Sequence, residues 1–187
     1  KGTPLNYDFR LKPLKKLKNS IKKHENDIKN ALFQDLGKSS TESYMSEIGM
    51  VLTELSYAIK HLKGWMKSRK VRTPLAQFHS KSFVVSEPLG VVLIMSPWNY
   101  PFMLAIDPLI GAISAGNCAV VKPASYAKNT SNIIKQILSE CFEEEYISVV
   151  LGGREQNAEL LEQRFDYIFF TGSVNVGKLV AEKASKN

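Results

Sequence analysis

The stretch V-V-L-I-M-S-P-W-N-Y-P, residues 91–101, indicates the fold: an apolar run is followed by a polar Asn99 that stands between two aromatic residues and is bracketed by two prolines. Short, continuous apolar runs of this kind are typical of strands that are buried on both faces of a sheet. A second apolar segment, with helical character, follows and ends at Gly116. The stretch therefore predicts a strand at 91–95, a loop that carries Asn99, and a helix at 104–115.

The same alternation of strand and helix continues along the chain. Apolar runs predict further strands at 118–121, 147–151 and 167–170. Amphipathic patterns predict helices at 129–142, 155–164 and 176–184. Repeated strand–helix–strand units indicate an α/β fold with a doubly wound parallel sheet and right-handed crossovers. In such sheets ligands bind beyond the carboxyl ends of the strands.

Two long helices are expected before this region. Apolar residues recur at steps of three and four over 12–35, where Gly37 would end the helix, and again over 41–67, where Thr41 could cap it. Residues 68–90 differ, because a loop-like segment is followed by a short β-prone one and the turn E-P-L-G.

Positive charge is concentrated in the N-terminal third of the chain. Residues 1–70 contain fifteen Lys and Arg against seven Asp and Glu, whereas the whole chain has a net charge of +7. A basic surface can bind nucleic acid or an acidic membrane. Here Leu14, Leu17 and Ile21 interrupt the lysines at helical spacing, without aromatic residues to stack bases. We interpret the lysines as a solvated helix face that binds no nucleic acid, and a non-catalytic basic binding module as the alternative.

Cysteine and histidine usage indicates the compartment. Cys118 and Cys141 are the only cysteines, without a CxxC motif, and the three histidines are scattered. This pattern argues against a disulfide scaffold and against a metal site, and it favours a reducing, cytoplasmic location. The first residues show no secretory signal, and no apolar run approaches the roughly 20 residues that span a bilayer. Because the chain begins without Met and ends at A-S-K-N, we expect a fragment.

Three polar or glycine-containing stretches fall at predicted carboxyl ends of strands. They are S-P-W-N-Y-P at 96–101, K-P-A-S at 122–125 and T-G-S-V-N-V-G-K at 171–178. At the third, free backbone N–H groups of a helix start could bind pyrophosphate, although an ordinary turn capped by Ser173 has the same pattern. The cation of Lys122 could contact a ribose or phosphate, or it could reach the solvent at the rim. The third stretch also contains G-x-x-x-x-G-K, but Leu179 stands where a P-loop needs Ser or Thr.

Together these motifs resemble a known family. The segments S-E-P-L-G-V-V-L-I-M-S-P-W-N-Y-P, G-A-I-S-A-G-N-C-A-V-V-K-P-A and F-D-Y-I-F-F-T-G-S-V-N-V-G-K resemble the aldehyde dehydrogenase superfamily, closest to its class 3, or fatty-aldehyde, branch. The resemblance covers nearly the whole chain. It implies a Rossmann-like cofactor domain, NAD or NADP as cofactor, an aldehyde as substrate, and a homodimer. Residues 1–67 would be the helical part of that domain, 68–90 an arm used in oligomerisation, and 91–187 the NAD(P)-binding region, truncated before the catalytic domain.

The resemblance also implies roles for individual residues. The side-chain amide of Asn99 would donate to the substrate carbonyl oxygen, which becomes negative as a catalytic thiolate attacks it; the thiohemiacetal then passes hydride to nicotinamide. The alternative is that Asn99 only satisfies loop backbone. The residues implied to bind the cofactor are Pro97, Trp98, Lys122, Ser125, Gly172, Ser173 and Gly177, with Lys122 at the adenosine ribose and the last three bordering the pyrophosphate.

Two further points follow from the resemblance. Many NAD-using members have Glu where this chain has Ser125, and a carboxylate would repel a 2′-phosphate, so we expect NADP to be tolerated. The nucleophilic Cys and general-base Glu of the family lie downstream of this chain, and neither Cys118 nor Cys141 is expected to replace the nucleophile. The chain alone should therefore be inactive. An acylating aldehyde dehydrogenase or an acyl-phosphate reductase of the same superfamily stays open, as do the aldehyde and any C-terminal membrane anchor.

Overall fold

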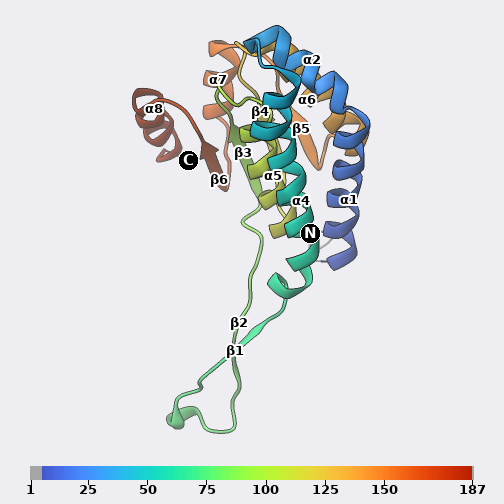
Figure 1. Cartoon of the computed structure of the whole chain (residues 1–187). Helices are drawn as coiled ribbons and strands as arrows, with labels where there is room; N and C mark the ends of the chain where they lie inside the picture. The colour runs from blue at the N-terminus through green and yellow to red at the C-terminus, as the bar shows by residue number, and fades with distance from the viewer. Residues whose placement is uncertain (1–5, 187) are drawn as a thin grey trace.

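A parallel sheet forms the centre of the molecule in the computed structural model, which describes residues 6–186 (Figure 1). Its strands are β3 (Val91–Met95), β4 (Cys118–Lys122), β5 (Ile147–Val149) and β6 (Tyr167–Phe170). The order is β5-β4-β3-β6, so the chain moves outward from β3 to β5 and then crosses to the other side of β3. Met95 is in register with Lys122 and with Phe170, which places the carboxyl ends of three strands side by side. The predicted α/β fold is confirmed, and its switch point lies between β3 and β6.

Helices cover both faces of this sheet. They are α5 (Met103–Ala115), α6 (Lys128–Cys141), α7 (Arg154–Leu161) and α8 (Val174–Ala184). Side chains alternate along β3: Val92 and Ile94 belong to the larger core, which includes α5 and α6, whereas Leu93 and Met95 belong to a smaller core that includes Leu161 of α7 and Val180 of α8. The period of two explains why an unbroken apolar run serves both cores.

The N-terminal helices complete the larger core. They are α1 (Tyr7–Lys23), α2 (Glu25–Leu36) and a continuous segment made of α3 (Ser40–Ser43), a π-helical turn (Tyr44–Ile48) and α4 (Gly49–Trp65). The stripe of Leu14, Leu17 and Ile21 is fully buried. The lysines between these residues are mostly exposed, which agrees with a solvated helix face.

Besides α7, which ends at Leu161 and not at 164, two details of the N-terminal helix prediction are wrong. The single helix expected over 12–35 breaks at His24, whose ring bonds to Asp27 and to Glu140 of α6, so a tertiary contact fixes the corner. The cap expected at Thr41 lies at Ser39, whose Oγ accepts a hydrogen bond from the N–H of Glu42 at 3.1 Å. The expected end at Gly37 is confirmed, because this glycine adopts the left-handed conformation with φ of 69°.

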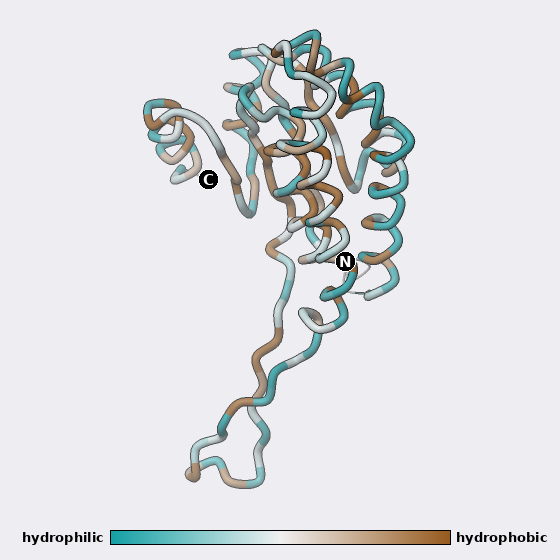
Figure 2. The backbone as a smooth tube through the Cα atoms, in the orientation of Figure 1, coloured by the Kyte–Doolittle hydropathy of each residue, from teal (hydrophilic) through white to brown (hydrophobic). Residues whose placement is uncertain are grey.

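A two-stranded antiparallel hairpin extends from the body as an arm (Figure 1). It consists of β1 (Arg69–Val71) and β2 (Ser82–Val84), with a short 3-10 turn (Leu75–Gln77) between them. Leu75 is 89% exposed and Phe78 is 74% exposed. Figure 2 shows hydrophobic residues along the central strands and again on the arm. Within residues 6–186, no helix combines the length and the apolar character that crossing a membrane requires.

Candidate active site

The loops that follow β3, β4 and β6 border one cavity of about 330 Å³ at the switch point of the sheet. Six of the seven residues that the sequence predicted to bind a cofactor line it: Pro97, Trp98, Lys122, Ser125, Gly172 and Ser173. Backbone hydrogen bonds tie the three loops together, from the N–H of Ser96 to the carbonyl of Lys122 at 3.2 Å and from the N–H of Thr171 to the carbonyl of Met95 at 3.1 Å. The cavity is therefore a product of the sheet order.

Asn99 lies on the same loop after β3, next to the cavity residue Trp98, and its side chain is exposed. It does not itself line the cavity. Its backbone carbonyl accepts a hydrogen bond from Nζ of Lys38 at 3.0 Å. The amide is thus held outside the hydrophobic core, where it can meet a molecule that enters from solvent.

Lys122 ends β4 and is only 3% exposed, so its ammonium group does not reach the solvent at the rim. Nζ donates to the carbonyl of Pro123 at 2.9 Å and to that of Gly152 at 2.7 Å. Burial lowers the pKa of this ammonium group. The two carbonyls fix the cation at the wall of the cavity.

The stretch Thr171–Gly172–Ser173 joins β6 to α8, and Ser173 is the N-cap of that helix. Its Oγ accepts from the N–H of Val176 at 3.4 Å, which is the ordinary capping contact considered from the sequence. Ser173 and Val176 both line the cavity. The cap and the ligand-facing position therefore coincide, and the N-terminal end of α8 borders the cavity.

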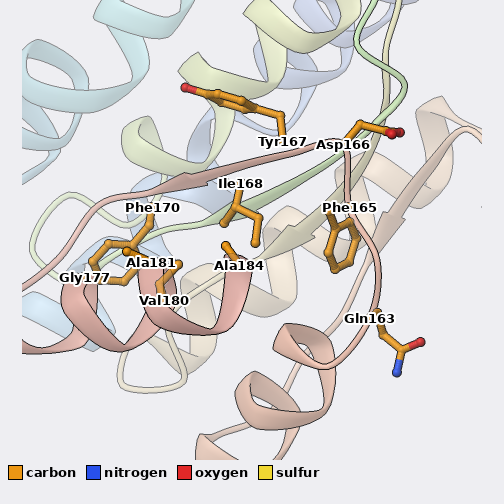
Figure 3. A pocket seen from close by; sticks show the side chains of 10 residues that line it. All are labelled: Gln163, Phe165, Asp166, Tyr167, Ile168, Phe170, Gly177, Val180, Ala181 and Ala184. Atoms are coloured by element: carbon orange, nitrogen blue, oxygen red, sulfur yellow. The ribbon is translucent and has the colours of Figure 1, made fainter. Parts of the chain in front are cut away.

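Gly177 lies elsewhere, in a neighbouring hollow between β6 and α8 (Figure 3). There Ile168 and Phe170 point from the strand toward the helix, whereas Tyr167 points from the opposite face (Figure 3). A Cβ atom on Gly177 would lie 3.5 Å from the ring of Phe170. That distance is an ordinary van der Waals contact, so packing against the ring does not by itself require glycine at this position.

Two buried polar atoms in the cavity wall suit a ligand rich in hydroxyl groups. Within residues 6–186, seven buried side-chain oxygens have no hydrogen-bond partner, and two of them, Oγ of Ser96 and Oδ1 of Asn157, belong to residues that line the cavity. Buried polar groups are rarely left unsatisfied. A dinucleotide carries ribose hydroxyls that could donate to both oxygens and phosphates that could accept from the Ser96 hydroxyl, so the residues present fit a dinucleotide cofactor. The sequence prediction missed both: Ser96 stood in a quoted motif, whereas nothing local marked Asn157 on α7.

Neither cysteine is placed for catalysis. Cys118 begins β4, at the end opposite Lys122, and Cys141 is buried at the end of α6. Burial raises the pKa of both thiols, which disfavours the reactive thiolate. The expectation that they are not the nucleophile agrees with these positions.

Comparison with known proteins identifies the family. The sequence model of the family described as "Aldehyde dehydrogenase family" matches residues 5–187. The chain is 49% identical over 179 residues to 4,4′-diaponeurosporen-aldehyde dehydrogenase of Staphylococcus aureus, a match that covers 96% of this chain and 39% of the relative. It is 44% identical over 180 residues to aldehyde dehydrogenase family 3 member B2 of Mus musculus, covering 96% and 38%.

A solved structure agrees with these sequence matches. The substrate-bound state of Staphylococcus aureus AldH superimposes with a TM-score of 0.96 at 48% identity, covering 97% of this chain and 40% of that one. The chain thus spans about two fifths of the length of the proteins it matches. The class 3 resemblance of its motifs is confirmed by the family 3 relative. The chain belongs to the aldehyde dehydrogenase family.

Proposed function

We propose that the protein containing this chain oxidises an aldehyde to a carboxylic acid, with NAD or NADP as hydride acceptor. The supporting observation is the cavity at the switch point, where three strand ends gather the six predicted residues around about 330 Å³. The cofactor, when bound, supplies the redox chemistry by accepting hydride at its nicotinamide ring. The chain's own residues bind and orient it.

Different parts of the cavity wall are proposed to contact different parts of the cofactor. The N-terminal end of α8 would face the pyrophosphate, because backbone N–H groups there favour negative charge. The fixed ammonium of Lys122 would meet the adenosine ribose. The unpaired oxygens of Ser96 and Asn157 would accept hydrogen bonds from ligand hydroxyls.

Asn99 would act on the substrate. A thiolate, supplied by the part of the relatives that this chain does not cover, would attack the aldehyde carbon and place negative charge on the carbonyl oxygen. The Asn99 amide would donate a hydrogen bond to that oxygen as the charge develops. When the carbonyl re-forms, the carbon would give up hydride, for which the bound cofactor would be the acceptor, and it would become a thioester. Attack by water would then break the C–S bond, releasing the carboxylic acid and returning the thiolate. The amide stays neutral throughout.

The test is the Asn99→Ala variant of the intact enzyme. We expect kcat to fall by about 10²–10³, because removing one oxyanion donor typically costs that much, with the cofactor Kd unchanged. Asn19→Ala, at an exposed position on α1, is the matched control. Full turnover by Asn99→Ala would refute the role. Running the assay with and without coenzyme A separates this reaction from that of an acylating enzyme.

Cofactor choice is proposed to depend on Ser125, which lines the cavity. A hydroxyl leaves room for a 2′-phosphate, whereas a carboxylate would repel it. We therefore propose that NADP is accepted as well as NAD.

The arm is proposed to mediate dimerisation. Its antiparallel hairpin extends from the body and exposes Leu75 and Phe78 at its tip. Large exposed apolar side chains on a projecting hairpin are typical of an interaction surface.

A further inference from the structure

We propose that Lys38 and Glu47 are positioning residues that hold the backbone from which the Asn99 amide extends. This inference rests on the proposed function, because it assumes that Asn99 donates to the substrate oxygen. The two residues come from the N-terminal helical region, and the contacts that they make reach the catalytic loop more than fifty residues later in the chain.

Lys38 and Glu47 form a buried ion pair. Nζ of Lys38 lies 2.6 Å from Oε1 of Glu47, and the two side chains are 8% and 0% exposed. A buried ion pair is weak evidence for stability, because desolvation of both charges offsets their attraction. Its role is better judged from the other groups that it contacts.

Within residues 6–186, the other side-chain contacts of this pair go to the loop and the helix start after β3. Nζ of Lys38 donates to the backbone carbonyl of Asn99 at 3.0 Å and lies 4.1 Å from the centroid of the Tyr100 ring. Oε2 of Glu47 accepts from the N–H groups of Phe102 at 2.8 Å and Met103 at 3.1 Å. The pair therefore holds the loop at the carbonyl of Asn99 and at the first turn of α5.

This arrangement matters because the Asn99 side chain is exposed. The backbone sets the Cα position and the Cα–Cβ direction from which an exposed amide extends, and the side-chain rotamers then share that origin. Pro97 and Pro101 restrict the backbone near the residue, but neither fixes the peptide plane between Asn99 and Tyr100. The hydrogen bond from Lys38 holds the oxygen of that plane. The carboxylate of Glu47 holds Lys38 in turn, and it also caps a helix whose N-cap residue, Phe102, has no side chain able to do so.

The experiment replaces the pair in the intact enzyme. The variant Lys38→Met/Glu47→Gln removes both charges and so leaves no unpaired buried charge. We expect kcat to fall by about 10- to 100-fold, since displacement of a reacting group by about 1 Å can cost 10²-fold, with the cofactor Kd unchanged. The control is Glu25→Gln/Lys29→Met, which removes another ion pair of 2.6 Å on α2 and should keep wild-type turnover.

A second comparison separates positioning from mere stabilisation. If the pair acts through the amide, replacing it in an Asn99→Ala background should change kcat by less than about twofold, because coupled residues are not additive. Wild-type turnover of the pair variant, or the same fold loss with and without Asn99, would overturn the inference. If the pair variant does not fold by circular dichroism, Lys38→Arg decides by the same two comparisons, because it keeps the charge but changes the geometry.

The result that would refute the proposed function differs from the result that would refute the role of Lys38 and Glu47. Full turnover by Asn99→Ala removes the catalytic role itself. Slow turnover by Asn99→Ala together with normal turnover by the pair variant removes only the role of Lys38 and Glu47.

Discussion

Replacement of Asp35 by Ala should destabilise the larger core through the start of α6. The N-cap residue of α6, Ala127, has no side-chain oxygen. Asp35 of α2 supplies one from 94 residues away: its carboxylate accepts from the backbone N–H and side-chain amide of Asn129 at 3.1 and 2.8 Å. It also accepts from the N–H and hydroxyl of Thr130 at 2.7 and 2.8 Å. One carboxylate thus caps α6 and fastens it to α2.

The size of the loss in the free energy of unfolding depends on which of these donors can be hydrogen-bonded by water in the variant. Asn129 is exposed and can be solvated in the variant, but Thr130 is fully buried. Loss of a cap costs about 1 kcal/mol, and a buried donor left unsatisfied costs about 1–3 kcal/mol. We expect Asp35→Ala to lower the free energy of unfolding by about 2–4 kcal/mol. Asp35→Asn, which keeps an acceptor oxygen but loses the charge, should cost about half as much.

Urea unfolding followed by circular dichroism measures this loss. With a slope of about 2 kcal/mol per molar urea, the midpoint of Asp35→Ala should fall by about 1–2 M. Glu144→Ala, at an exposed turn after α6, is the control for removal of one acidic charge and should stay within about 0.5 kcal/mol of wild type. A loss for Asp35→Ala no larger than that of the control would refute the reasoning.

Three further predictions concern charge, cofactor and assembly. Hydrogen bonds to Asp27 and Glu140 raise the pKa of His24 above 6.5, so its contribution to the free energy of unfolding is fully present below pH 6.5 and is lost as pH rises through the folded-state pKa. The free energies of unfolding of wild type and His24→Gln, measured across pH 5–9, should therefore converge at high pH, and a constant difference between them would contradict this. Ser125→Glu should lower kcat/KM with NADP by at least about tenfold while sparing NAD, and equal effects on both cofactors would contradict the proposed basis of choice. If the arm mediates dimerisation as proposed, Leu75→Ser/Phe78→Ser should shift sedimentation of the intact enzyme toward the monomer, and unchanged sedimentation would contradict the proposed role of the arm tip.

The sheet and the cavity could be predicted because their signals are local or follow from parallel topology. The strands at 91–95 and 167–170 are confirmed with the predicted bounds, since unbroken apolar runs end at polar residues. Lys122, Ser125 and Gly172 meet because the carboxyl ends of parallel strands share one edge of the sheet. To predict that the three loops share one cavity, it was enough to recognise that each of them follows a strand.

The parts that escaped prediction depend on contacts between distant segments. The helix break at His24 is set by Glu140, which lies 116 residues away. Asn157 enters the cavity from α7, where its own sequence neighbourhood is that of an ordinary amphipathic helix. Lys38 was one of many lysines in a basic region, and its partner Glu47 carries no motif. The roles of such residues depend on contacts with distant segments, which the local sequence does not show.

The loop after β3 therefore has two sides with separate supports. Pro97 and Trp98 line the proposed cofactor cavity, which depends on the strand ends of the sheet. The carbonyl of Asn99 and the ring of Tyr100 instead contact Lys38, which comes from the helical region. Because the two supports share no side chain, damage to one should leave the other in place. Cofactor affinity and turnover should then be separable by mutation, with substitutions at Lys122 changing the cofactor Kd and substitutions at Lys38 changing kcat. If every contact instead supported both cofactor binding and turnover, each of these substitutions would change the cofactor Kd and kcat together.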